Sequence, residues 1–271
     1  MKQEFALAYL TTAPMEALEA LLVAYKVGYH AIGVRLAPLS PGGHFSALGE
    51  HPALLRQTVA RVKDTGVTIL DVEGVRLDER SRTGHFNRLL EVSAALGAKA
   101  ISVIGDDPQE PRLVNSFADL CDAAAPYHLE VALEFMPYSA VPDANSALRI
   151  VTQAQRRNAR IVVDFLHATR SNTTREDLAA IPREWLGYAQ LCDAPAEIPA
   201  TREALIHTAR YERLLPGAGG IDVRGMVADL PAGLPLSVET PNVGQLALYG
   251  AEGWARRALS ATRQVITVRD L

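Results

Sequence analysis

Residues 131–141 read "VALEFMPYSAV". A run of apolar, strand-forming residues stops there at a carboxylate, Glu134, and Pro137 follows three positions later. In a strand that is otherwise built for burial, such an acid is costly unless something compensates its charge. The same arrangement, an apolar strand that ends in a polar residue, recurs three more times towards the carboxyl terminus.

Short apolar or β-branched runs alternate with longer helical patterns along the whole chain, although no sequence repeat is evident. Eight runs are predicted as strands: "EFALAYL" (4–10), "AIGVRL" (31–36), "VTILDVE" (67–73), "AISVIG" (100–105), "EVALEF" (130–135), "RIVVDF" (160–165), "YAQLCD" (188–193) and "LPLSVE" (234–239). Helices are predicted between them over 14–28, 51–66, 85–98, 111–127 and 143–157.

This alternation predicts an α/β protein in which residues 1–271 form a single (β/α)8 TIM barrel domain. A doubly wound open sheet is the alternative. It normally carries a glycine fingerprint after an early strand, whereas "YLTTAP" (9–14) follows the first strand here. The segment 35–52, rich in Pro, Gly and Ser, is interpreted either as an active-site flap or as an ordinary surface loop.

The composition excludes several classes of protein. With 48% apolar and 21% charged residues, the chain is an ordinary globular one, and a formal net charge of -4 provides no basic surface for nucleic acid. Two cysteines do not form a disulfide framework and fit a reducing compartment. No signal peptide or membrane-spanning segment is recognised, so we expect a soluble cytoplasmic protein with no membrane partner. A homo-oligomer is compatible with the sequence.

Barrel enzymes place their chemistry at the carboxyl ends of the strands, and polar residues stand at four consecutive predicted ends. They are Glu134, Asp164, Gln190 with Asp193 close by, and Glu239. Each has a simple explanation by itself: an ion pair with arginine, a helix cap, a loop hydrogen bond or a turn. Crowded together, however, the carboxylates repel one another, and a divalent cation removes this conflict. Oxygen ligands favour Mg²⁺ or Mn²⁺, with Co²⁺ or Zn²⁺ as alternatives.

Other polar residues near the predicted strand ends are candidates for contact with a substrate. His167, three residues after Asp164, is interpreted as a general acid or base, or as a structural histidine of its loop. Glu73 is favoured over Asp71 as the acid that reaches the mouth from the third strand, because it lies nearer the strand end. Asp193 is expected to contact the substrate from the end of the seventh strand.

Aromatic residues and a glycine-rich turn complete the set of candidates. Tyr138, Phe135 and Trp185 are expected either to wall the pocket, with Tyr138 in contact with substrate, or to pack in the core. The turn "PGAGGID" (216–222) could cradle a phosphate through its backbone N–H groups. A plain turn followed by Asp222 as a helix cap is the preferred interpretation.

The motifs "ALEF", "VVDFLH", "AQLCDAP", "RLLPGAGGID" and "LSVETPN", in this order, resemble the xylose isomerase-like barrels of the sugar phosphate isomerase/epimerase superfamily. The resemblance covers essentially the whole chain and is clearest over 130–242. That superfamily holds ketose epimerases, hydroxypyruvate isomerase, inosose dehydratase and bacterial 3-dehydroshikimate dehydratases. The motifs are specific for the superfamily and do not distinguish its substrates.

The resemblance implies roles for individual residues. The family's metal ligands follow strands five to eight and correspond to Glu134, Asp164, Gln190 and Glu239. Its aspartate-x-x-histidine pair corresponds to Asp164 and His167. Its arginine near the glycine-rich turn corresponds to Arg213, as a clamp for an anion or hydroxyl, although from the residues alone a surface arginine is expected. Ketose 3-epimerases usually have histidine in place of Gln190, and this departure argues against that reaction.

We therefore expect a metal-dependent isomerase or epimerase that acts on a small polyhydroxylated carbonyl compound. The cation polarises the carbonyl, a carboxylate removes the neighbouring proton, and the developing enediolate is stabilised by the cation. Glu134 and Glu239 serve both as ligands and as bases, one taking the proton and the other returning it. If a β-hydroxyl leaves instead, with His167 as acid, the same site is a dehydratase, which is the alternative.

Other classes of protein fit less well. A Schiff-base aldolase needs a lysine at the barrel mouth, and none of the four lysines stands at a predicted strand end. A DNA-repair endonuclease of the same superfamily would need a multi-metal site rich in histidine. A protein that binds metal and ligand without turnover is a further alternative, and it would show no proton exchange on any candidate substrate.

Overall fold

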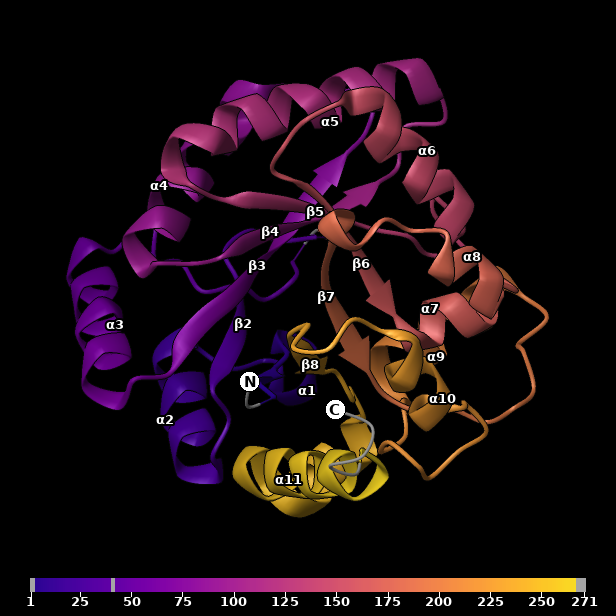
Figure 1. The fold of residues 1–271 in the computed structure, drawn as a ribbon. Coiled ribbons are helices and arrows are strands. Elements are labelled where there is room, and N and C mark those ends of the chain that lie inside the picture. Colours follow the sequence, from indigo (N-terminus) through magenta and orange to yellow (C-terminus); the bar gives the residue numbers. More distant parts are fainter. Residues whose placement is uncertain (1–2, 40–41, 267–271) are drawn as a thin grey trace.

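The computed structural model describes residues 3–39 and 42–266, and it is a closed barrel of eight parallel strands surrounded by helices (Figure 1). The strands are β1 (Phe5–Leu7), β2 (Ala31–Arg35), β3 (Thr68–Leu77), β4 (Ala100–Gly105), β5 (Glu130–Glu134), β6 (Ala159–Asp164), β7 (Leu186–Leu191) and β8 (Leu236–Val238). They pair in chain order, and β1 closes the barrel against β8. The predicted TIM barrel is confirmed, and the doubly wound open sheet is excluded.

Helices form the outer ring and connect each strand to the next (Figure 1). They are α1 (Tyr9–Thr12), α2 (Ala17–Val27), α3 (Pro52–Thr65), α4 (Asn87–Leu96), α5 (Glu110–Ala124), α6 (Ala144–Ala154), α7 (Phe165–Arg170), α8 (Arg175–Ala179), α9 (Arg202–Tyr211), α10 (Val223–Asp229) and α11 (Val243–Val265), with 3-10 turns η1 (Thr83–Phe86), η2 (Ala125–Tyr127) and η3 (Arg183–Trp185). All five predicted helices are present as α2 to α6. None of the helices in the described part of the chain combines the length and apolar character needed to cross a membrane.

Two separate groups of apolar side chains build the core. The larger group packs the strands against the helices. The smaller one consists of strand residues alone and fills the barrel interior: Ala6, Ala31, Leu70, Ala100, Ala132, Val162 and Tyr188. Most of these are small because little space remains inside an eight-stranded barrel. The exception is Tyr188, whose hydroxyl donates a hydrogen bond to Asp71 Oδ2 at 3.1 Å inside the barrel.

Two strand boundaries differ from the prediction in ways that shape the mouth of the barrel. The first strand ends at Leu7, because the following residues turn into α1. Strand β3 continues past Glu73 to Leu77 through an irregularity, at which its register against β4 shifts between Val72 and Val75. Gly74 makes this possible: it has a φ of 115°, and a Cβ there would lie 2.6 Å from a backbone carbonyl oxygen. Glu73 therefore lies within β3 and not at its end.

Candidate active site

A cavity of about 490 Å³ opens at the carboxyl ends of the strands. Its wall contains the predicted site residues Glu134, His167, Gln190, Glu239 and Tyr138. The loop between β2 and α3 also contributes to this wall through its described residues, as expected for a loop of the active site. Whether that loop moves as a flap stays a prediction.

The four predicted metal ligands lie at the ends of β5 to β8, and all four are buried. Glu134 and Asp164 end their strands, Gln190 is the penultimate residue of β7, and Glu239 directly follows β8. Asp164 is the ladder partner of Gln190. Gln190 Nε2 donates a hydrogen bond to Glu239 Oε1 at 3.3 Å. The sequence pattern at these strand ends thus becomes a single cluster of oxygen donors.

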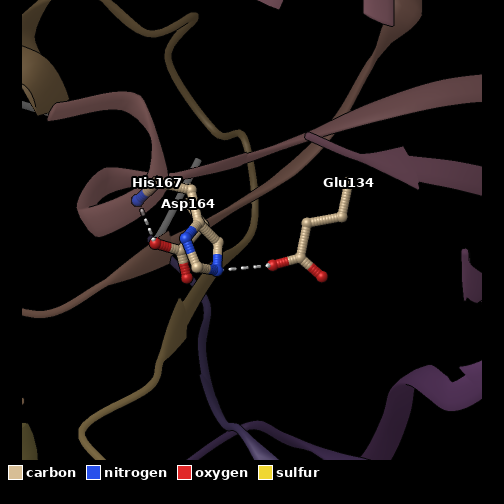
Figure 2. A group of neighbouring side chains, drawn as sticks. All are labelled: Glu134, Asp164 and His167. Carbon is tan, nitrogen blue, oxygen red and sulfur yellow. Dashed lines mark hydrogen bonds and ion pairs between the residues drawn. The ribbon is translucent and has the colours of Figure 1, made fainter. Parts of the chain in front are cut away.

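His167 joins this cluster from the first turn of α7 (Figure 2). Its backbone N–H donates a hydrogen bond to Asp164 Oδ1 at 3.0 Å, so Asp164 caps the helix, and its fully buried side chain lies behind the cavity wall. Its ring Nε2 lies 3.6 Å from Glu134 Oε1. One ligand atom from each of Glu134, Asp164 and His167 lies within 4.8 Å of the others. The ring of Tyr138 packs edge-on against the imidazole, with 5.5 Å between ring centres.

Arg213 has a different position from the one expected of a substrate clamp. Its guanidinium is buried and pairs with two predicted metal ligands, through Nη1 to Asp164 Oδ2 at 2.6 Å and Nη2 to Glu239 Oε2 at 3.1 Å. Its Nε donates to the Ala209 carbonyl oxygen, and Nη1 also contacts Cys192 Sγ. Since each of its three nitrogens already has a partner, Arg213 acts first as a counter-charge for the cluster. The surface position suggested by the residues alone is wrong.

The electrostatics of the cluster follow from burial and crowding. Burial, with Asp164 and other carboxylates nearby, raises the pKa of Glu134 well above its usual value. Burial also raises the pKa of Glu239, although Arg213 opposes the effect. For Asp164, Arg213 and His167 outweigh the opposing effect of burial and lower the pKa to about 2. Burial lowers the pKa of His167 to about 4, so the imidazole is neutral at neutral pH.

A divalent cation fits this set of donors. The Oε1 of Gln190 is buried and has no hydrogen-bond partner among the described residues. Arg213 pairs with Asp164 and Glu239 but not with Glu134, so its single positive charge cannot balance three ionised carboxylates. A cation held by these four side chains would satisfy the amide oxygen and offset the remaining negative charge. The oxygen donors suit Mg²⁺ or Mn²⁺, and the nearby imidazole of His167 would also suit Zn²⁺ or Co²⁺.

The two acids of β3 occupy different environments, and Glu73 is the one at the cavity. Glu73 lines the cavity, and its Oε2 accepts a hydrogen bond from Arg35 Nη2 at 2.7 Å. Asp71 lies deeper, bonded to Tyr188 in the barrel interior. Burial is the main cause that raises the pKa of Asp71 well above its usual value, and Glu73 adds to it.

Two of the three expected wall aromatics do not reach the cavity. Tyr138 lines it. Phe135 is buried in the core outside the barrel strands. Trp185 lies in η3, immediately before β7 begins, and so at the end of the barrel opposite the mouth. For Phe135 and Trp185 the core role, which the sequence left open, is the one observed.

Asp193 holds its own loop and does not line the cavity. Its Oδ2 accepts hydrogen bonds from the N–H groups of Gly217 and Gly219, and its Oδ1 accepts from those of Ala194 and Ile221. Both oxygens are thus used, and the structure assigns Asp193 to the glycine-rich turn instead of the substrate. The N–H groups that could have cradled a phosphate are occupied by this carboxylate.

The glycine-rich turn (216–222) ends in a helix cap, which confirms the preferred interpretation of this segment. Asp222 caps α10 by accepting a hydrogen bond from the N–H of Gly225 at 3.0 Å.

Sequence reasoning missed the arginines of the cavity wall. Arg35 and Arg76 line it from β2 and β3, and Arg202 and Arg210 line it from α9. The first two had a signal in the sequence: each stands in the same tetrapeptide, "GVRL", at the carboxyl end of a strand. The two on α9 had none, because their helix lies after a long loop whose direction is not encoded locally.

Comparison with known proteins places this geometry in a family. A family model for the xylose isomerase-like TIM barrel matches residues 21–265, which include all four predicted ligands. A 3-dehydroshikimate dehydratase of Pseudomonas aeruginosa is 26% identical over 197 residues, which make up 67% of this chain and 30% of that protein. The chain thus spans less than a third of the length of this relative.

Two solved structures share the fold over nearly their whole lengths. One is the crystal structure of the IolI protein with a bound zinc atom, with a TM-score of 0.78 and 22% identity over 97% of this chain and 98% of that one. The other is D-psicose 3-epimerase in the presence of D-fructose, with a TM-score of 0.76 and 15% identity over 97% and 99% of the two chains. The protein described here belongs to the xylose isomerase-like TIM barrel family.

Proposed function

We propose that the protein is a divalent-metal-dependent dehydratase of a small hydroxylated cyclic ketone that carries a carboxylate, with 3-dehydroshikimate as the first candidate. The observation that carries the proposal is a row of three side chains on α9, two of them cationic, that lines the cavity. The relative named 3-dehydroshikimate dehydratase supports the same choice. So does Gln190, which replaces the histidine usual in ketose 3-epimerases.

The row on α9 consists of Arg202, Ile206 and Arg210, which are spaced by four residues and lie on one face of the helix. Arg202 donates a hydrogen bond to the Tyr138 carbonyl oxygen at 3.0 Å, at the rim of the cavity. Burial raises the pKa of the Tyr138 hydroxyl, and Arg210 is close enough to oppose that shift slightly. Among the described residues, neither arginine has a carboxylate partner. A neutral sugar would leave both charges unused, whereas a substrate carboxylate would pair with them.

The reaction follows from the residues that face one another. A bound divalent cation would polarise the substrate carbonyl as a Lewis acid. Glu134, whose side chain lines the cavity, removes the proton from the carbon next to the carbonyl. His167, neutral and 3.6 Å from Glu134, passes that proton to the β-hydroxyl. The carbon–oxygen bond breaks, a carbon–carbon double bond forms, and one water leaves.

An isomerase or epimerase is the second candidate. It is favoured by one feature, the presence of two glutamates with raised pKa values, Glu134 and Glu239, on different strands of the same cavity. One could remove a proton and the other return it at a different face or carbon. Dehydration needs no second base. If Glu134 and Glu239 are equally necessary as proton carriers, the isomerase or epimerase is the better assignment.

Proton NMR in D₂O separates the two candidates. Protein loaded with Mg²⁺ or Mn²⁺ is incubated with 3-dehydroshikimate, and in parallel with D-fructose, hydroxypyruvate and an inosose. New aromatic signals from 3-dehydroshikimate are expected, since loss of water from its ring yields an aromatic product. Deuterium next to a carbonyl without loss of water would instead assign an isomerase or epimerase. Metal binding without either change would support a binding protein and contradict the proposal.

A further inference from the structure

On the β2–β3 side of the cavity, an ion pair carries two polar atoms without a partner. Arg35 ends β2, and Glu73 is its ladder partner on β3. Arg35 Nη2 and Glu73 Oε2 are 2.7 Å apart, while Arg35 Nε and Glu73 Oε1 are buried and have no hydrogen-bond partner among the described residues. A buried donor or acceptor that is left unpaired costs roughly 1–3 kcal/mol. Because both side chains line the cavity, a ligand bound there is placed to supply the missing partners.

The surroundings hold this pair in one orientation. The guanidinium of Arg35 lies over the ring of Tyr9, 4.4 Å from its centre. The Tyr9 hydroxyl is in turn bonded to His44, at 2.9 Å to Nδ1 and 3.1 Å to the backbone oxygen. All four residues line the cavity. A donor and an acceptor fixed in this way are prepared for a ligand before it arrives.

The pair also faces the predicted metal ligands. Because the eight strands close in chain order, β2 and β3 lie across the barrel from β6 and β7, which carry Asp164 and Gln190. Burial is the main cause of the raised pKa values of Glu134 and Glu239, but Glu73 contributes to both. Its carboxylate is thus within electrostatic reach of both glutamates, and a small substrate held by the cluster would reach it.

We propose that Arg35 and Glu73 form a subsite for hydroxyl groups of the substrate. Glu73 Oε1 accepts a hydrogen bond from a hydroxyl, and Arg35 Nε donates one to the oxygen of the same hydroxyl or of its neighbour. The occupant is neutral, because the pair has no net charge and an anion beside Glu73 would be repelled. This inference rests on the proposed function and orients its substrate, with the carboxylate towards α9 and the ring hydroxyls towards β2 and β3.

The test compares two ligands that differ only in hydroxyl groups. Shikimate and cyclohex-1-ene-1-carboxylate share a ring and a carboxylate, but only shikimate has ring hydroxyls. Their dissociation constants are measured by calorimetry on metal-loaded wild type, Glu73→Gln and Asp106→Asn. Asp106, which directly follows β4, is the matched control, since it forms a similar but more exposed pair with Arg76 of β3. Circular dichroism and metal content establish that each variant is folded and loaded.

We expect wild type and Asp106→Asn to prefer shikimate by at least about tenfold, and Glu73→Gln to lose most of that preference. Cyclohex-1-ene-1-carboxylate should bind Glu73→Gln as well as wild type or better, since the charge of Arg35 is no longer offset. An unchanged preference in Glu73→Gln, no preference in wild type, or no binding of shikimate would each overturn the subsite. If the preference behaves as expected but 3-dehydroshikimate is not dehydrated, the proposed function fails and the subsite stands.

Discussion

Arg213 and Asp164 form an ion pair in which both side chains are buried, with Nη1 2.6 Å from Oδ2. The second terminal nitrogen of the same guanidinium reaches Glu239 Oε2 at 3.1 Å. One cation of the chain thus links two predicted metal ligands that come from different strands. The arrangement positions their carboxylates and leaves a net negative charge at the site, which is the condition under which a divalent cation binds.

Arg213→Met should destabilise the metal-free protein by about 3–5 kcal/mol, because it leaves buried carboxylates without their counter-charge. Saturating Mn²⁺ should raise the free energy of unfolding by more in the variant than in wild type, since the ion replaces the lost positive charge. Urea unfolding with and without EDTA measures both effects.

Arg149→Met provides the control for this experiment, because it removes an exposed pair with Glu110 and should change stability by less than about 1 kcal/mol. A loss of similar size in both variants would contradict the role given to Arg213.

Glu134→Gln should keep the fold and lose both metal and activity. The amide removes one negative ligand and the base, so we expect metal affinity to fall at least about tenfold and turnover by on the order of 10³-fold. Metal content after dialysis, circular dichroism and the dehydration assay give the three readouts. Glu130→Gln, at the other end of β5 and paired with Arg160, is the matched control and should behave as wild type. Full metal content in Glu134→Gln would remove this residue from the site.

Arg210→Met should raise KM for 3-dehydroshikimate about 10- to 100-fold with little change in kcat, since it removes a charged hydrogen bond to a part of the substrate that does not react. Steady-state kinetics at constant ionic strength measure the two constants. Glu203→Gln, on the same helix and exposed, is the control. An unchanged KM in Arg210→Met would show that the carboxylate is bound elsewhere.

Asp71→Asn should change the pH dependence of stability. Burial holds the pKa of Asp71 well above the usual value of 3.8 for an aspartate, so the folded protein keeps a proton that the unfolded chain releases. In wild type this makes folding less favourable as pH rises above 3.8, by up to about 1.4 kcal/mol per pH unit until the folded pKa is reached.

The asparagine has no such proton and still accepts the hydrogen bond from Tyr188, so its advantage over wild type should grow with pH. Urea unfolding between pH 5 and pH 8 tests this. The exposed Asp119→Asn should follow the wild-type curve. A constant difference between Asp71→Asn and wild type across this range would mean that Asp71 is ionised throughout.

Much of the fold and part of the site could be predicted from local patterns. Each strand is marked by a short apolar run, and each of Glu134, Asp164, Gln190 and Glu239 interrupts or follows such a run at one end. In a parallel barrel the carboxyl ends of all strands meet on one face, so position along the strand was enough to bring these side chains together. This part of the site could be predicted because it depends only on the order of residues along each strand.

Contacts between distant segments could not be predicted in the same way. Arg213 lies 49 residues from Asp164 in the chain, and a solvent-exposed arginine would have had the same local sequence. Asp193 stands beside a strand end as a substrate contact would, yet it turns to the backbone N–H groups of a loop more than 20 residues further on. The direction of a side chain depends on which partners are nearby, and only the closed barrel determines those partners.

Local patterns along the chain were sufficient to predict that eight strands form a barrel and that oxygen donors meet at its mouth, because strand pattern and strand ends are local properties. Which charges neutralise one another and which stay free for a ligand depends on the folded arrangement. Arg213 is used within the cluster, whereas Arg202 and Arg210 face the cavity, and the difference comes from the path of the chain after β7. Electrostatic energy depends on distance in space, and folding brings together charges that are far apart in sequence.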